Sequence, residues 1–123
     1  MDLNLLSAYL PRDRRCALAT GRPLPDRAEG AVLLADLAGF TPLADALSAT
    51  LGPRRGVEEL TRLLNGVYEI LIAQVHHHGG SVVSFVGDGL VCWFDDDLGH
   101  SHGEAAHRAV ACGLAMQRVL ASF

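Results

Sequence analysis

Two aspartates have the placement that ligands of a divalent metal need. Asp36 ends the apolar run 31–36, and Asp88 lies between Gly87 and Gly89, where two other apolar runs meet. Carboxylate oxygens are hard ligands of the kind that Mg²⁺ or Mn²⁺ takes from a protein, with substrate phosphates completing the shell. The pattern therefore predicts metal-assisted phosphoryl chemistry, provided that the fold brings the two side chains together.

Each aspartate also has an ordinary structural interpretation. Asp88 before Gly89 is common turn chemistry, and Asp36 could cap the loop that follows it. That loop, residues 37–41, contains a glycine and leads into a predicted helix, whose first backbone N–H groups could hold a phosphate. The two carboxylates and this loop, which we call the phosphate cradle, are placed together in the predicted fold. This joint placement favours the functional interpretation over the structural one.

The elements that must position these residues follow from apolar periodicity. Residues 31–36 predict a strand buried on both faces, because the run is continuously apolar up to the carboxylate. Thr41 as N-cap, with Pro42 after it, predicts a helix as far as residue 51. Apolar residues at three- and four-residue spacing predict a second helix from about Gly56 to Gly79 and Gly80.

The second half of the chain predicts a hairpin and a last helix. Residues 82–86 and 90–94 are the strands of the hairpin, the polar loop 95–99 follows, and the helix runs over 103–120. Strand, two helices, hairpin and helix make an α+β fold, the ferredoxin-like βααββα start of a larger domain that lacks the later strands. The first strand is then an apolar edge that invites self-pairing.

Composition narrows the classes of function. The chain of 123 residues has a net charge of −4, with ten arginines and no lysine, so it lacks the clustered basic surface that nucleic-acid binding needs. No apolar run approaches the ~20 residues of a membrane span, and the start lacks the features of a signal peptide. Three widely spaced cysteines predict buried thiols in a cytoplasmic protein.

Several motifs resemble one family. Residues 35–41, Ala-Asp-Leu-Ala-Gly-Phe-Thr, resemble the Asp-x-x-Gly-Phe-Thr motif of the class III adenylate/guanylate cyclases. His78-Gly79-Gly80 and the segment 84–89 resemble the Gly-Gly and Gly-Asp segments of that family, and Asn65 and residues 105–117 also match. The resemblance covers about residues 29–121. It implies a partial cyclase domain over 30–123, preceded by an arm or linker over 1–29 like the lead-in of bacterial multidomain signalling proteins of the soluble-adenylyl-cyclase type.

The resemblance also implies roles for individual residues. The metal-binding group of two ions, Mg²⁺ or Mn²⁺, would consist of the carboxylates of Asp36 and Asp88 and the backbone carbonyl of Leu37. The β- and γ-phosphates of a nucleoside triphosphate would lie on the backbone of Gly39, Phe40 and Thr41. The implied reaction is attack of the ribose 3′-hydroxyl on the α-phosphate, which gives a 3′,5′-cyclic nucleotide and pyrophosphate in intracellular signalling.

The sequence departs from the family in two ways. Many adenylate cyclases carry a lysine that recognises the base, and this chain has Ser84 at that position. The serine hydroxyl can donate or accept a hydrogen bond but carries no charge. The resemblance as a whole still favours ATP over GTP as the substrate. No residue of this chain matches the family's catalytic asparagine and arginine, so the resemblance implies no catalytic residue here and no turnover by the chain alone. A second cyclase domain would complete the site, and ATPase and helical-repeat domains could follow. The alternative is a non-catalytic module for dimerisation or nucleotide sensing.

Three further groups of residues have competing interpretations. His76, His77 and His78 point in three directions on a helix, so a polar helix C-terminus is favoured over a metal site. His100 and His102, beside the aspartates 95–97, form a solvated loop or catch an ion. The arginines at 12, 14 and 15 predict a solvated face, with a phosphate or partner contact as the alternative.

Overall fold

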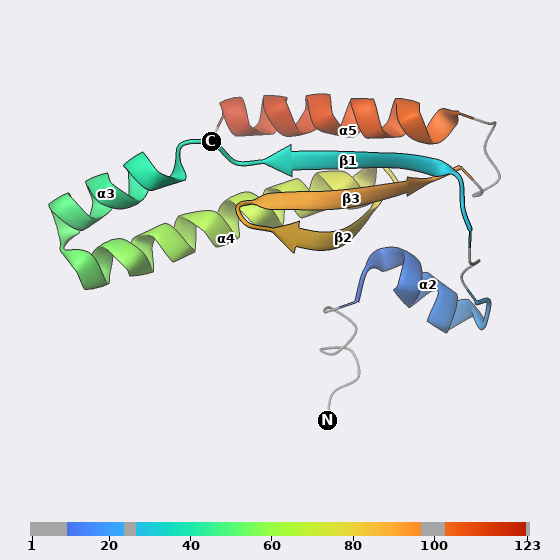
Figure 1. Cartoon of the computed structure of the whole chain (residues 1–123), viewed down its shortest axis with the longest axis horizontal. Helices are drawn as coiled ribbons and strands as arrows, with labels where there is room; N and C mark the ends of the chain where they lie inside the picture. The colour runs from blue at the N-terminus through green and yellow to red at the C-terminus, as the bar shows by residue number, and fades with distance from the viewer. Residues whose placement is uncertain (1–9, 24–26, 97–102, 123) are drawn as a thin grey trace.

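The computed structural model describes residues 10–23, 27–96 and 103–122. Three strands, β1 (Gly30–Asp36), β2 (Ser81–Val86) and β3 (Gly89–Asp95), form an antiparallel sheet in the order β1-β3-β2 (Figure 1). The helices are α2 (Arg12–Thr20), α3 (Phe40–Leu51), α4 (Pro53–His77) and α5 (Glu104–Ala121). The predicted α+β class and element order are confirmed over this part of the chain. None of the described helices is long and apolar enough to cross a membrane.

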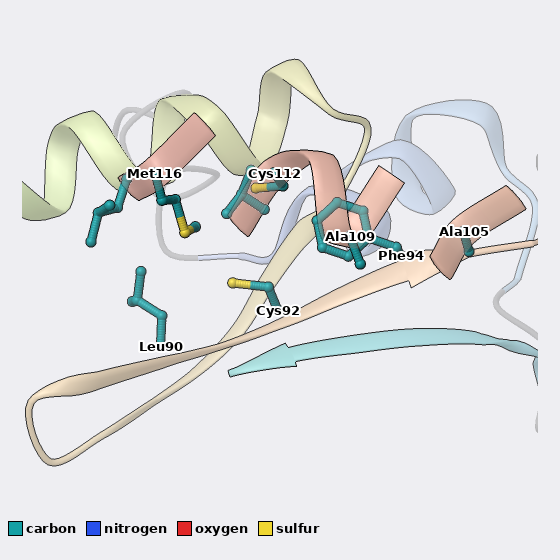
Figure 2. Close-up of a cluster of buried hydrophobic side chains, with 9 residues drawn as sticks. Leu90, Cys92, Phe94, Ala105, Ala109, Cys112 and Met116 are labelled. Atoms are coloured by element: carbon teal, nitrogen blue, oxygen red, sulfur yellow. The ribbon is translucent and has the colours of Figure 1, made fainter. Parts of the chain in front are cut away.

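The core lies between the sheet and the helices α4 and α5. Leu90, Cys92 and Phe94 of β3 point towards α5 (Figure 2), where the buried residues are Ala105, Ala109, Cys112 and Met116. Leu71 and Val75 of α4 complete the buried cluster. Cys92 and Cys112 have no exposed surface, so both thiols are small core residues, as predicted. The prediction of a buried thiol is wrong for Cys16, which is exposed on α2.

The prediction that the first strand is buried on both faces is wrong. Its residues alternate between half-buried and exposed, and Val32 and Leu34 keep 59% and 71% of their surface exposed. The reason is that the buried cluster, with α4 and α5, lies on one face of the sheet. We call the opposite face, formed by Val32, Leu34, Asp36, Ser84, Val86 and Val91, the outer sheet face. It is apolar along β1 and ends in a carboxylate.

The helix α3 begins two residues earlier than predicted, and its N-cap differs. Gly39 is the N-cap, with a φ of +87° that an L side chain rarely adopts. The Thr41 side chain makes no capping hydrogen bond, because Thr41 already lies inside the helix. The first turn of α3 therefore keeps backbone N–H groups without a side-chain partner.

The long helix α4 begins at Pro53 rather than near Gly56. Proline is favoured at a first helical position because its missing N–H is not needed there. The predicted glycine terminus is present: the N–H of Gly79 donates to the His76 carbonyl at 3.1 Å, and the N–H of Gly80 donates to the Val75 carbonyl at 2.8 Å. These two hydrogen bonds are the pattern of a Schellman motif.

The N-terminal arm contains a helix that the sequence analysis does not predict. α2 spans nine residues between Pro11, its N-cap, and Gly21, its C-cap. Its first turn is attached to the rest of the fold, because Arg12 Nη1 donates to the His76 carbonyl at 3.0 Å and the Asp13 N–H donates to Ser81 Oγ at 2.9 Å. Arg12 and Arg15 are consequently half-buried, and of the three predicted surface arginines Arg14 alone is exposed.

The other end of the sheet is held by two polar groups. Asp96 Oδ1 accepts the N–H of Ala105 at 2.9 Å and so caps α5 from across the preceding loop. Arg108 of α5 donates to the carbonyls of Asp95 and Gly79 at 2.5 and 3.2 Å. This end of β3 is thus joined to both long helices. Residues 97–102, with the two loop histidines, lie outside the described part of the chain.

Candidate functional site

The register of β1 against β3 brings the two predicted metal ligands to one end of the sheet. Asp36 is the register partner of Gly89, the residue that follows Asp88. The N–H of Leu37 donates to the backbone carbonyl of Asp88 at 3.2 Å, so the strand end and the hairpin turn are bonded directly. Both aspartate side chains are exposed and available to a ligand.

The hairpin turn leaves space beside the Asp36 carboxylate. Val86 pairs with Gly89, so the two turn residues are Gly87, at a φ of +57°, and Asp88. The predicted hairpin is confirmed, although the pair at its tip is Gly-Asp rather than Asp-Gly. A Cβ at Gly89 would lie 3.0 Å from the Ala35 carbonyl oxygen and 3.5 Å from Asp36 Oδ1. Glycine at 89 therefore permits the close approach of the two strands.

The pKa of the Tyr68 phenol is affected by the two carboxylates at this end of the sheet. Burial raises the pKa of Tyr68, and the carboxylates of Asp88 and Asp36 raise it further. The phenol thus lies within electrostatic range of both aspartates, and its ring packs edge-to-face on Phe85 with centroids 5.7 Å apart. Tyr68 is not among the predicted site residues, although its spacing of four and three residues from Leu64 and Leu71 on α4 is a detectable signal of a core-facing position.

The predicted phosphate cradle lies at the start of α3. Gly39 leads directly into the helix, and Leu43 is the first residue whose N–H reaches back to the Gly39 carbonyl, at 3.2 Å. Pro42 carries no N–H, so the N–H groups of Phe40 and Thr41 are the donors that the first turn can offer to an anion. A cavity of about 520 Å³ adjoins this loop, with apolar walls from α3 and α4.

The predicted base-recognition position lies on the outer sheet face together with Asp36. Ser84 pairs with Val91, and Val91 pairs with Leu34. Residues directly opposite each other share a face, so Ser84 and Leu34 lie one row of side chains away from Asp36. Ser84 is exposed, and its hydroxyl donates a long hydrogen bond of 3.4 Å to the Phe85 carbonyl.

The oxygen atoms at this end of the sheet, from the carboxylates of Asp36 and Asp88 and the nearby backbone, suit a hard divalent cation that also binds substrate. Among the described residues there is no cluster of three or more His, Cys, Asp or Glu side chains that could hold a metal ion. Two carboxylates with nearby backbone oxygens suit Mg²⁺ or Mn²⁺, which usually bind through one or two carboxylates plus phosphates. The helical histidines form no such cluster, and His78 Nδ1 instead lies 2.8 Å from the Gln74 carbonyl oxygen.

Comparisons with known proteins point to one class. No protein-family model matches the chain. Over 70 residues the chain is 31% identical to adenylate cyclase type 10 of Homo sapiens, a stretch that covers 57% of this chain and 4% of that protein. Adenylate cyclase type 10 of Oryctolagus cuniculus matches to the same extent. The chain thus spans a small part of the length of these relatives.

Solved structures agree with the sequence relatives. The adenylyl cyclase CyaB from P. aeruginosa superposes with a TM-score of 0.58 at 31% identity, over 74% of this chain and 42% of that one. The guanylyl cyclase Cya2 gives a TM-score of 0.56 at 34% identity, over 74% and 41%. A bacterial light-regulated adenylyl cyclase shares the fold, with a TM-score of 0.67 at 21% identity over 97% of this chain and 32% of that one.

The α+β sheet with two carboxylates at one end defines a nucleotide-cyclase-like domain. More particularly, its sequence motifs and its likeness to adenylyl and guanylyl cyclases support a partial class III nucleotide cyclase catalytic domain.

Proposed function

We propose that this chain supplies the metal-binding half of a cyclase active site. The observation that carries the proposal is the β1–β3 register, which places Asp36 beside the turn that bears Asp88. When paired with a second cyclase domain in the cytoplasm, the assembly converts a nucleoside triphosphate, ATP in preference to GTP, into a 3′,5′-cyclic nucleotide and pyrophosphate. Residues 30–123 form the domain, and residues 1–29 the arm before it.

The residues act by binding and orienting the substrate. The carboxylates of Asp36 and Asp88 and the carbonyl of Leu37 would hold Mg²⁺ or Mn²⁺, and the bound ion would neutralise phosphate charge and favour ionisation of the attacking hydroxyl. The N–H groups of Phe40 and Thr41, after the turn at Gly39, fix the terminal phosphates. Held in this way, the α-phosphate faces the ribose 3′-hydroxyl, and pyrophosphate leaves.

The outer sheet face is where the second cyclase domain binds. Val32 and Leu34 expose apolar surface on the same face as Asp36 and Ser84. Contiguous exposed apolar surface on a soluble domain marks an interaction site. A partner seated there covers the apolar rows and brings its own residues to the substrate. The base then lies near Ser84, which offers a hydroxyl.

Metal binding tests the roles of the two aspartates. We expect Mn²⁺ to broaden the amide NMR signals of Leu37 and Gly89 first, because these amides lie beside the proposed ligands. Asp36→Ala and Asp88→Ala should each weaken Mn²⁺ binding by more than about tenfold, the lower end of what the loss of even an outer-shell partner costs. Asp45→Ala, an exposed aspartate on α3, is the matched control. Unchanged affinity in both site variants would remove the metal site.

Turnover tests the proposal of a half site. The pure chain with Mn²⁺ and ATP or GTP should form no cyclic AMP or cyclic GMP, because no group is assigned to the transition-state charge. Adding a second cyclase domain that carries the asparagine and arginine should restore cyclic AMP formation, and Asp36→Ala should abolish it. Clear turnover by the pure chain contradicts the half site. Nucleotide binding without turnover in the mixture favours the non-catalytic module.

A further inference from the structure

A second cavity lies between α2 and the edge formed by α4 and β2. Its volume is about 280 Å³, just below the volume of about 300 Å³ at which small-molecule sites begin. The arm helix forms one wall through Leu10, Pro11, Arg12 and Arg15, and the domain forms the other through Ile72, His76, Val82, Val83 and Phe85. The two hydrogen bonds that attach α2 to the carbonyl of His76 and to Ser81 hold these walls together.

The cavity concentrates positive charge in an acidic chain. Two guanidinium groups, of Arg12 and Arg15, line it, and none of the described lining residues is acidic. The Nε of Arg15 is buried and has no hydrogen-bond partner among the described residues. A donor on a charged group that is removed from water without an acceptor is costly, so the cavity is electrostatically suited to an anion.

The imidazole of His76 faces the same cations. Burial lowers the pKa of His76, and the charges of Arg15 and Arg12 lower it further. Burial and both arginine charges thus favour the neutral imidazole, and the guanidinium groups of Arg12 and Arg15 supply the positive charge of the cavity. An anion bound between these groups would oppose both arginine charges at His76 and raise its pKa.

The remaining walls are hydrocarbon. Ile72, Val82, Val83 and Phe85 line the side contributed by α4 and β2, and the Phe85 ring is already held by its edge-to-face contact with Tyr68. A cavity with guanidinium groups on one side and apolar side chains on the other suits a ligand that has an anionic group at one end and an apolar body. An inorganic anion would leave the apolar wall unused, and a neutral hydrocarbon would leave Arg15 without an acceptor.

We propose that this cavity binds a small monocarboxylate with an apolar body, with its carboxylate on Arg12 and Arg15 and its body against Ile72, Val82 and Phe85. Carboxylate and guanidinium form paired, charge-assisted hydrogen bonds, and the side chains of Arg12 and Arg15 both line the cavity. The site is separate from Asp36 and Asp88 and does not depend on nucleotide chemistry. Because it spans α2 and the domain, a bound carboxylate also fixes the arm to the domain.

Octanoate is the probe, titrated into the full 123-residue chain and followed by two-dimensional NMR. We expect shifts at amides of α2 and β2, with the Leu37 and Gly89 amides unmoved, and an increase in the pKa of His76 measured from its imidazole signals. Acetate tests charge without an apolar body, octanol tests the body without charge, and inorganic phosphate tests a plain oxyanion. Octanol lacks the charge-assisted hydrogen bonds, and acetate and phosphate lack the hydrocarbon that the apolar wall would bury. Each should therefore bind at least about tenfold more weakly than octanoate.

Two pairs of variants test whether octanoate binds in this cavity. Arg15→Gln should weaken octanoate binding about tenfold or more, whereas Arg14→Gln, an exposed arginine on the same helix outside this cavity, should change it less than about twofold. Val83→Asp puts a carboxylate on the cavity wall at an exposed position, so it keeps the fold and should also abolish binding. Val57→Asp, exposed on α4 and outside this cavity, is its control.

The outcomes are decisive in both directions. Selective loss in Arg15→Gln and Val83→Asp, with a raised His76 pKa, supports the site. Binding of octanol or phosphate as strong as that of octanoate overturns it, as does equal loss in Arg14→Gln or an unmoved His76. Shifts confined to the outer sheet face likewise overturn it.

Discussion

Cys92 and Cys112 illustrate, at the scale of single residues, how burial controls reactivity. Burial raises the pKa of each thiol to about 11, and the neighbouring Cys112 adds to the effect on Cys92. The thiolate is the reactive form, so at pH 8 both are almost entirely protonated as well as covered. Cys16 on α2 is exposed.

We expect the native chain to consume one equivalent of Ellman's reagent at pH 8, and three equivalents in denaturant. Cys16→Ser should reduce the fast native reaction to none, whereas Cys112→Ser should leave it at one. The reaction of the two core thiols should increase as the pH approaches 11. A rapid native reaction in the Cys16→Ser chain would show that the core between β3 and α5 opens more readily than its packing indicates.

The same scale shows what a sequence can and cannot predict about the site. Asp36 and Asp88 are predictable because each stands at a recognisable break, a strand end and a hairpin turn. The helical spacing of Tyr68 predicts only that its side chain faces the core, because its relation to the two carboxylates arises when α4 packs beside the hairpin. Arg15 resembles a surface residue in sequence, and only the docking of α2 buries its Nε.

Gly56 sets the spacing between two elements, α3 and α4. A Cβ at this buried position would lie 2.9 Å from the backbone N and Cα of Ser48 in α3. Alanine gains about 1 kcal/mol of helix propensity over glycine. Overpacking against rigid backbone costs about 1–3 kcal/mol, so the clash outweighs the gain.

We therefore expect Gly56→Ala to lower the free energy of unfolding in urea by about 1 kcal/mol. It should also move the amide signals of Phe40 and Thr41, since both residues lie in the first turn of α3. Val57→Ala, at the adjacent exposed position, is the control and should leave those signals in place. A stabilised Gly56→Ala chain would mean that the two helices separate at little cost.

The apolar patterns in the sequence predict the type and order of the helices and strands well. They predict the residues at which these elements begin and end less well. The strand at 31–36 and the helix around Leu60 to Val75 are long enough for their apolar spacing to be unambiguous. The start of α3 depends on the backbone at Gly39, where a positive φ leaves no distinct sequence pattern beyond the glycine itself. The helix α2 is hidden by the flanking prolines and glycines, and tertiary contacts with His76 and Ser81 hold it.

The whole molecule presents β1 as an edge of the described sheet, because β3 lies on one side of it and no described strand lies on the other. A groove of about 660 Å³ runs between β1 and α5 along this edge. Exposed edges with apolar side chains are templates for pairing with another chain. The predicted edge position of the strand is confirmed, and self-pairing remains a prediction.

We expect the 123-residue chain to self-associate with increasing concentration in sedimentation velocity. Leu34→Lys should suppress this association, since charge on an edge strand opposes pairing. Leu114→Lys, at a similarly exposed position on α5, distinguishes the edge from the groove: it should have the smaller effect. A monodisperse monomer at all concentrations, with β1 amides protected from exchange, contradicts the prediction.

The order β1-β3-β2 has a consequence for the time course of folding. β2 and β3 are joined by a two-residue turn and can pair locally, on the scale of about microseconds for a hairpin. β1 must wait for β3 to be in place, because two helices and the first hairpin strand separate them in the chain. Asp36 therefore meets Asp88 only at the docking of β1. A cation that needs both carboxylates cannot speed the early hairpin and acts instead by slowing the escape of β1.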